Sequence, residues 1–114
     1  MLRIDIKSYN GTAILRCSGR IVFGVEGETL RSVAKSRKES DLQVDLSAVE
    51  TVDATGLGLL VELRDWALRQ GRTLRFTNPS HFVMRLILLT KLHGILGISP
   101  NYDRRGLAPA ALIA

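Results

Sequence analysis

The dipeptide Asn10-Gly11 narrows the fold of this chain more than any other feature, because it lies between two segments of alternating polarity. Asn-Gly is the strongest short signal for a two-residue β-hairpin turn. Residues 2–7 and 13–18 alternate apolar with polar side chains, as two half-buried strands do. A turn at this dipeptide also fixes a register that joins apolar with apolar and acid with base. The expected pairs are Tyr9 with Thr12, Ile6 with Leu15, Ile4 with Cys17, and Asp5 with Arg16.

Beyond the hairpin the pattern changes to alternating helices and strands. Apolar residues at helical spacing predict helices over residues 24–38, 55–70 and 82–93, and short apolar runs predict strands over 42–46 and 73–77. Residues 95–98 fit a last short strand or a turn. Strands joined through helices favour parallel pairing. We therefore expect an α/β fold: a mixed β-sheet with an N-terminal β-hairpin and flanking helices, in the order β-β-α-β-α-β-α.

Length and charge limit the class of protein. With 114 residues, 46% of them hydrophobic, the chain is too apolar to be disordered, and we expect one domain over residues 1–98 with a C-terminal tail over 99–114. The net charge is +5, but the basic residues are spread along the chain, so we do not expect a nucleic acid as a partner. The apolar runs are far shorter than the ~20 residues that a membrane span needs. We expect a soluble cytoplasmic protein, with Cys17 buried as a small hydrophobe.

Residues 45–58 hold most of the chemical information. A predicted strand leads through acidic and hydroxyl residues into a helix whose start carries Gly56 and Gly58. Glycine in a helix costs about 1 kcal/mol relative to alanine, so two of them need a reason. Either the helix start packs closely on the sheet, or another molecule approaches the bare backbone. The spacing lacks the lysine of a phosphate-binding P-loop.

The run from Asp53 to Gly58, with Ala54, Thr55, Gly56 and Leu57 between them, resembles the D-[SA]-[ST]-G-hydrophobic-[GA] signature of STAS domains, the anti-sigma factor antagonists. The flanking Val44-Asp45-Leu46-Ser47 and Gly71-Arg72-Thr73-Leu74 are similar to strands of that family. Ala54 stands where many members carry serine, which leaves Thr55 as the one hydroxyl inside the motif.

The resemblance implies a protein-binding switch without enzymatic activity, metal or cofactor. In the family, the residue at the position of Thr55 is phosphorylated by a serine/threonine kinase that is also an anti-sigma factor. The unphosphorylated form binds this kinase and so releases a sigma factor. The partner-binding residues implied for this chain are Asp53, Ala54, Gly56, Leu57 and Gly58. Two alternatives stay open: Thr55 is a plain capping hydroxyl, or the domain docks on an ATPase in a transport or lipid-trafficking complex without phosphorylation.

The predicted helix over residues 55–70 has an apolar arc wider than a one-sided surface helix needs. One interpretation is that the helix is wedged between the sheet and a neighbouring helix. The other is that Leu59, Leu63 and Trp66 form a self-association surface, as the tail over 99–114 also could. Neither histidine has an acidic residue at metal-ligand spacing, so we expect no metal site at His81 or His93.

Overall fold

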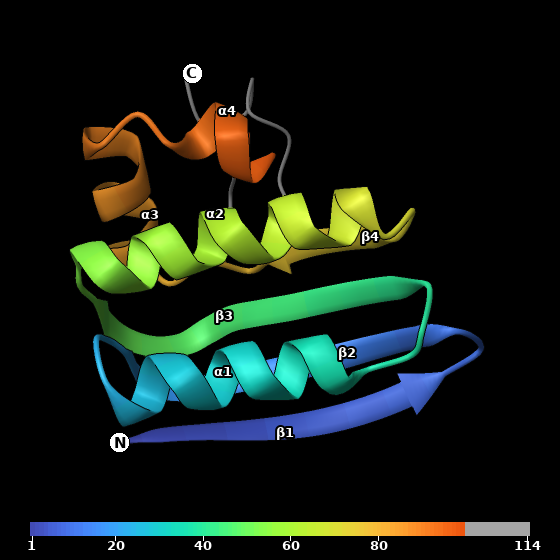
Figure 1. Ribbon diagram of the computed structural model, residues 1–114. Helices are drawn as coiled ribbons and strands as arrows, with labels where there is room; N and C mark the ends of the chain where they lie inside the picture. Colours follow the sequence, from blue (N-terminus) through green and yellow to red (C-terminus); the bar gives the residue numbers. More distant parts are fainter. Residues whose placement is uncertain (100–114) are drawn as a thin grey trace.

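The structure, a computed structural model, describes residues 1–99 of the chain. Four strands form one mixed sheet in the order β1-β2-β3-β4 (Figure 1). The strands are β1 (Leu2–Tyr9), β2 (Thr12–Ile21), β3 (Asp41–Val52) and β4 (Thr73–Thr77). β1 is antiparallel to β2, whereas β2 with β3 and β3 with β4 are parallel. The expected α/β class and mixed sheet are confirmed. The tail predicted over 99–114 lies, beyond Ser99, outside the described residues.

The opening hairpin has the predicted register. Asn10 and Gly11 have φ values of 48° and 80°, which is the left-handed conformation that a type I′ turn requires at both positions. All four predicted pairs are present: Tyr9 with Thr12, Ile6 with Leu15, Ile4 with Cys17, and Asp5 with Arg16. The local turn chemistry therefore determines which face of both strands is apolar.

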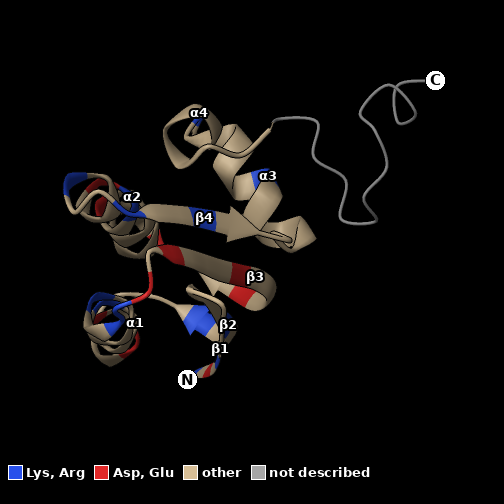
Figure 2. Ribbon diagram, turned by 90° about the vertical axis from the view of Figure 1, so that its right-hand side faces the viewer, with Lys and Arg blue, Asp and Glu red and all other residues tan. Residues whose placement is uncertain are grey.

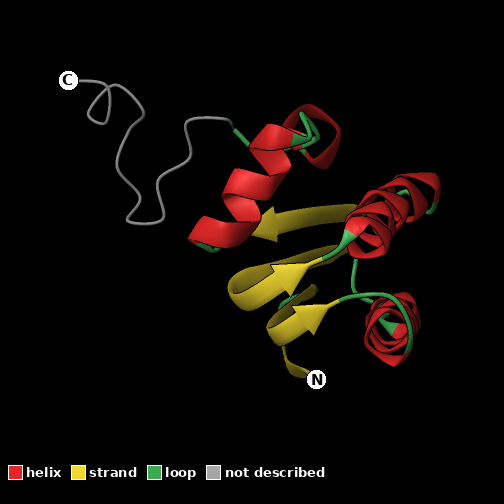
Figure 3. Ribbon diagram, turned by 90° about the vertical axis from the view of Figure 1, so that its left-hand side faces the viewer, coloured by secondary structure: helices red, strands yellow, loops and turns green. Residues whose placement is uncertain are grey.

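Four helices surround the sheet: α1 (Val25–Ser36), α2 (Ala54–Arg69), α3 (His81–Leu89) and α4 (His93–Leu96). α1 and α2 lie side by side on one face, and α3 and α4 lie at the β4 end of the molecule (Figures 2 and 3). α1 follows β2, and α2 follows β3. Because these two strands are parallel, both helices begin at the same end of the sheet, where the strands finish. Two helix N-termini are thus neighbours, which positions the site described below.

The core lies between the sheet and these two helices. Fully buried leucines and valines come from every layer: Leu15, Leu30, Val44, Leu46, Leu60 and Leu63. Burying such a side chain stabilises a fold by roughly 1.5–3 kcal/mol, so this layer holds the helices against the sheet. Cys17 is fully buried in the same core, and burial raises its pKa to about 12. The prediction that Cys17 acts as a small hydrophobe is confirmed.

Two predicted elements differ in the structure. The strand predicted over 42–46 continues to Val52. β3 stays paired with β2 through two register shifts, and at each shift β3 has one residue more than β2. Its buried residues accordingly change spacing from two to three: Leu42, Val44, Leu46, Val49 and Val52. Residues 95–98 do not form a strand. The helix predicted to reach His93 ends at Leu89, and α4 follows, closed by the left-handed Gly97 at φ 70°.

Candidate functional site

Asp53 joins the start of α2 to the segment between β2 and α1. It is the N-cap of α2: its Oδ1 accepts a hydrogen bond from the Gly56 backbone N–H at 2.7 Å. Its Oδ2 accepts a second from the Phe23 N–H at 2.9 Å. These two backbone donors, Phe23 first, lower the pKa of Asp53 below its ordinary value. Asp53 is therefore a fixed, ionised side chain, only partly exposed, that holds two loops together.

Thr55 lies in the first turn of α2 and is exposed, as is Ala54 before it. Because Asp53 fills the N-cap, the alternative that Thr55 is the capping hydroxyl is wrong. Within residues 1–99 the Thr55 hydroxyl has no hydrogen-bond partner. This side chain is accessible and performs no visible structural task, which suits a site that another protein modifies.

The two glycines at the start of α2 have different explanations. A Cβ atom on Gly56 would lie 2.0 Å from the Ile21 carbonyl oxygen and 2.9 Å from Cγ1 of Val52. Gly56 is therefore required for packing of the helix on the sheet. Gly58 is exposed, and a Cβ atom there would meet no described atom within 4 Å. Internal packing explains only the first glycine, and the second leaves bare helix backbone open to another molecule.

Leu57 is 6% exposed and lies in the core with Gly56. Of the residues expected to bind a partner, the accessible ones are thus Ala54 and Gly58, with Asp53 in part.

A groove of about 360 Å³ separates the beginnings of α1 and α2. Its lining residues come from the β2–α1 connection and from both helices: Val22, Phe23, Gly24, Gly27, Glu28, Arg31, Thr55, Gly56 and Leu59. Phe23, which lines the groove, and the nearby Val25 are 75% and 79% exposed, which is unusual for large apolar side chains so close together. Neither residue was predicted from the sequence. The available signal was their position on either side of Gly24, in a connection that must turn from a strand into a helix.

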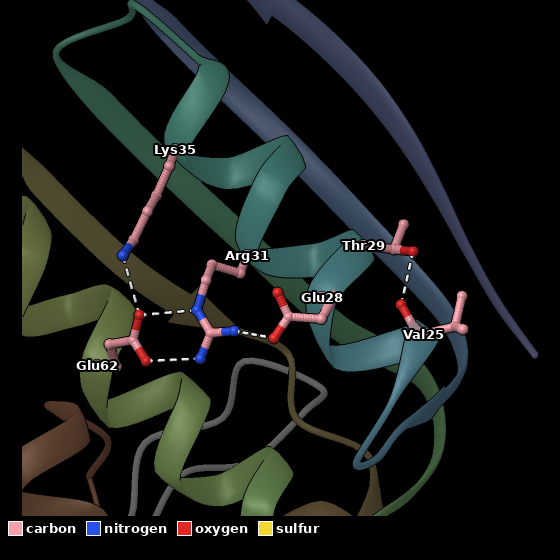
Figure 4. A network of polar contacts seen from close by, with 6 residues as sticks. All are labelled: Val25, Glu28, Thr29, Arg31, Lys35 and Glu62. Carbon is pink, nitrogen blue, oxygen red and sulfur yellow. Dashed lines mark hydrogen bonds and ion pairs between the residues drawn. The ribbon is translucent and has the colours of Figure 1, made fainter.

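The groove is flanked by an ion-pair network that joins the two helices (Figure 4). Glu62 of α2 accepts hydrogen bonds from Nε and Nη2 of Arg31, at 2.9 and 2.8 Å, and from Nζ of Lys35 at 2.9 Å. Arg31 also bonds through Nη1 to Glu28. The hydrogen bonds from Arg31 and Lys35 lower the pKa of Glu62 to about 2. Arg31 and Lys35 are thus paired inside the fold, and Arg37 likewise pairs with Glu39. The remaining basic side chains are scattered over several elements (Figure 2).

The self-association surface expected on α2 is wrong for two of its three residues. Leu59 is 3% exposed and Leu63 is fully buried, because α2 packs against the sheet and has α1 and α4 beside it. The other interpretation, a wedged helix, is the one observed. Trp66 is only partly buried, and the guanidinium of Arg72 lies 5.3 Å from the centre of its ring.

The described residues offer little for other chemistry. Among residues 1–99 there is no cluster of three histidine, cysteine or acidic side chains that could hold a metal ion. His81 is exposed in the first turn of α3. None of the described helices has the length and apolar character needed to cross a membrane.

The chain is a small mixed-sheet domain in which a helix start carries an exposed hydroxyl beside an open groove. The STAS domain family matches residues 3–104, and the chain belongs to that family. The chain is 28% identical over 103 residues to the anti-sigma-B factor antagonist of Bacillus subtilis (strain 168), covering 90% of this chain and 94% of that protein.

Two solved structures share the fold. An anti-sigma factor antagonist from Mycobacterium paratuberculosis matches with a TM-score of 0.73 and 24% identity, over 90% of this chain and 89% of the other. A sulfate transporter family protein from Wolinella succinogenes matches with a TM-score of 0.66 and 21% identity, over 90% and 88%. At these identities the likeness is one of fold.

Proposed function

We propose that this protein is an anti-sigma factor antagonist that is controlled by phosphorylation of Thr55. In its unphosphorylated form it binds an anti-sigma factor that is also a serine/threonine kinase, in the cytoplasm, and so releases a sigma factor. The observation that carries the proposal is the exposed Thr55 hydroxyl, without a partner in the described chain, in the first turn of a helix. The similarity to the Bacillus subtilis antagonist supports it.

The binding surface of the proposal extends from Asp53, Ala54 and Gly58 to Phe23 and Val25. The two exposed apolar side chains lie beside the groove that Thr55 lines, and the Asp53–Phe23 hydrogen bond holds them at the start of α2. Large apolar side chains at the centre of an interface often carry most of its binding energy. The phosphate would add a charge of about −1.5 to −2 in the middle of this surface. A partner that binds it closely would then meet repulsion and a desolvation cost, while the helix start itself tolerates the charge.

The decisive experiment uses the candidate kinase, ATP, the wild type and the Thr55→Ala variant. We expect intact mass to rise by one phosphate in the wild type only, and the variant to fold normally because Asp53, not Thr55, caps α2. Titration with the kinase in the absence of ATP should show tight binding that Phe23→Ser weakens by about tenfold or more. The matched control is Leu68→Ser, which also replaces an exposed apolar side chain, 63% exposed, but one that does not line the groove. This variant should bind normally. A phosphate on Thr55→Ala would remove Thr55 from the proposal.

The second candidate is a STAS subunit that docks on an ATPase of a transport or lipid-trafficking complex without being phosphorylated. The fold likeness to the sulfate transporter family protein is the observation that favours it. It predicts unchanged mass after treatment with kinase and ATP, together with binding to the ATPase of such a complex that Thr55→Glu does not alter.

A further inference from the structure

We propose that Arg31 is the intramolecular partner of the phosphate on Thr55, and that phosphorylation transfers one arm of its guanidinium from Glu28 to the phosphate. The inference rests on the proposed function, because it concerns the modified form of the same site. It assigns a second role to the Arg31–Glu28–Glu62 network, which also joins α1 to α2.

The three guanidinium nitrogens of Arg31 bond to two carboxylates (Figure 4). Nε and Nη2 form a bidentate pair with Glu62, at 2.9 and 2.8 Å, and this pair anchors the guanidinium to α2. Nη1 bonds to Glu28, which precedes Arg31 by one turn of α1. Nη1 can therefore change its partner while the bidentate pair stays intact.

The two carboxylates differ in how firmly they can hold Arg31. The side chain of Glu28 is 72% exposed, whereas that of Glu62 is 39% exposed. Glu62 also offers both of its oxygens to the planar fork, which is the stronger geometry. An exposed single contact contributes little in water, so the bond to Glu28 is the one that a competing anion can replace. A phosphate is such an anion, with three acceptor oxygens and nearly twice the charge.

Thr55 and Arg31 line the same groove of about 360 Å³. Arg31 is the one cationic side chain among the described residues that line it, and Lys35, although bonded to Glu62, does not line it. Because α1 and α2 both begin where two parallel strands end, Glu28, in the first turn of α1, lies nearer than Arg31 to the end at which Thr55 sits.

The exchange changes what a partner meets. The phosphate bonds to Nη1 in the groove, which neutralises part of its charge, and Glu28 loses the cation that it faces in the unmodified protein. A partner that approaches the groove then meets an unpaired Glu28 carboxylate in addition to the phosphate. Phosphorylation would in this way alter the charge on α1 as well as on α2, without moving either helix.

The test uses full-length protein with phosphothreonine encoded at position 55, so that no kinase is needed. The apparent second pKa of the phosphate is measured by ³¹P NMR titration in the wild type, in Arg31→Gln and in the matched control Lys35→Gln. Since a nearby cation favours the dianion, we expect Arg31→Gln to raise this pKa by about 0.5 unit or more. Lys35→Gln should leave it within about 0.2 unit, because Lys35 does not line the groove. Equal pKa values in the wild type and Arg31→Gln would overturn the inference and leave the proposed function standing.

A second measurement needs no variant and covers the case in which Arg31→Gln does not fold. Side-chain ¹H–¹⁵N spectra of the wild type are compared with and without phosphate on Thr55. We expect the Arg31 guanidinium signals to move and the Lys35 ammonium signal to stay. Unmoved Arg31 signals would refute the pairing. Failure of every candidate kinase to modify Thr55, by contrast, would count against the proposed function and would not change either NMR result.

Discussion

The backbone of Gly56 lies directly against the carbonyl oxygen of Ile21, so closely that a Cβ atom at Gly56 would come within 2.0 Å of that oxygen. This contact joins the start of α2 to the end of β2. The hydrogen bond from the Phe23 N–H to Asp53, two residues further along the chain from Ile21, reinforces it. The exposed residues on both sides of the groove are therefore positioned by one backbone contact and by the Asp53 carboxylate.

The glycine pair gives a prediction with its own control. Gly56→Ala should destabilise the fold by about 1–3 kcal/mol, because the added methyl group meets the Ile21 carbonyl and Val52. Gly58→Ala should stabilise it by about 0.5–1 kcal/mol, because alanine is the better helix former and the added methyl meets no described atom. Urea unfolding of the two variants measures both changes. If Gly58→Ala also weakens binding to the partner, the bare backbone at this position belongs to the interface. Equal stability of the two variants would contradict the packing explanation.

Thr55→Glu should weaken partner binding without rearranging the backbone. A negative charge in the first turn of α2 interacts favourably with the helix dipole, so the folded state has no reason to change. Glutamate carries one charge and phosphothreonine nearly two, so the effect should be partial. Amide NMR spectra of the wild type and the variant, followed by titration of each with the partner, provide the measurement. Spectral changes far beyond the helix start would favour a conformational switch instead.

The ion pair between α1 and α2 predicts a pH dependence. The pKa of Glu62 is lowered to about 2, chiefly by Arg31 and then by Lys35. The stability that this carboxylate contributes is thus fully present above its ordinary pKa of 4.5 and is lost as the pH falls from there to about 2. Glu62→Gln should therefore cost about 1 kcal/mol at pH 7, and the cost should vanish near pH 2.

The matched control for Glu62 is Asp65→Asn on the same helix. Asp65 forms an exposed pair with Arg69 at 3.0 Å, and such a pair contributes about 0.3–0.5 kcal/mol. Thermal unfolding between pH 2 and 7 compares the two variants with the wild type. A cost of Glu62→Gln that is the same at both ends of this range would show that the charge of Glu62 is not what stabilises the helix pair.

The proposed domain boundary predicts that truncation after Ile98 leaves the fold intact. Leu96 is fully buried and Ile98 is 6% exposed, and the Ile98 N–H donates to the His93 carbonyl at 2.8 Å. A protein that ends at Ile98 keeps these contacts. Its thermal transition should remain cooperative, and a midpoint lowered by more than about 10 °C would show that later residues complete the core. Binding by the truncated protein then reports whether those residues contact the partner.

The sequence alone was sufficient to predict those structural elements that short local motifs determine. The Asn10-Gly11 turn determines the hairpin register within a few residues. The N-cap of α3 is likewise a local signal, because Ser80 is a residue type that caps helices and its side chain accepts from the Val83 N–H. The length of β3 could not be predicted in this way, because its extra residues interrupt the alternation and are defined only by the pairing with β2. The end of α3 at Leu89 depends on Lys91, whose φ of 59° the sequence does not signal.

The candidate site was predictable to the same extent. Asp53 and Thr55 belong to one contiguous motif, so a linear reading found them. Phe23 and Val25 precede this motif by about thirty residues in the sequence. They join the site only because parallel strands bring the starts of two helices to the same end of the sheet. The apolar arc of α2 was compatible with a wedged helix and with a self-association surface. Leu59 and Leu63 are covered by neighbouring elements whose positions no pattern on α2 records.

The order of the strands has a consequence for the behaviour of concentrated protein. β1 and β4 are the sheet edges, where unpaired backbone groups could recruit a second molecule into a growing fibril. β1 carries Arg3, Asp5 and Lys7 along its length, and β4 has only five residues with Arg75 at its centre. Charged or short edges oppose this kind of pairing. The chain is thereby protected from aggregation at the edges of its sheet.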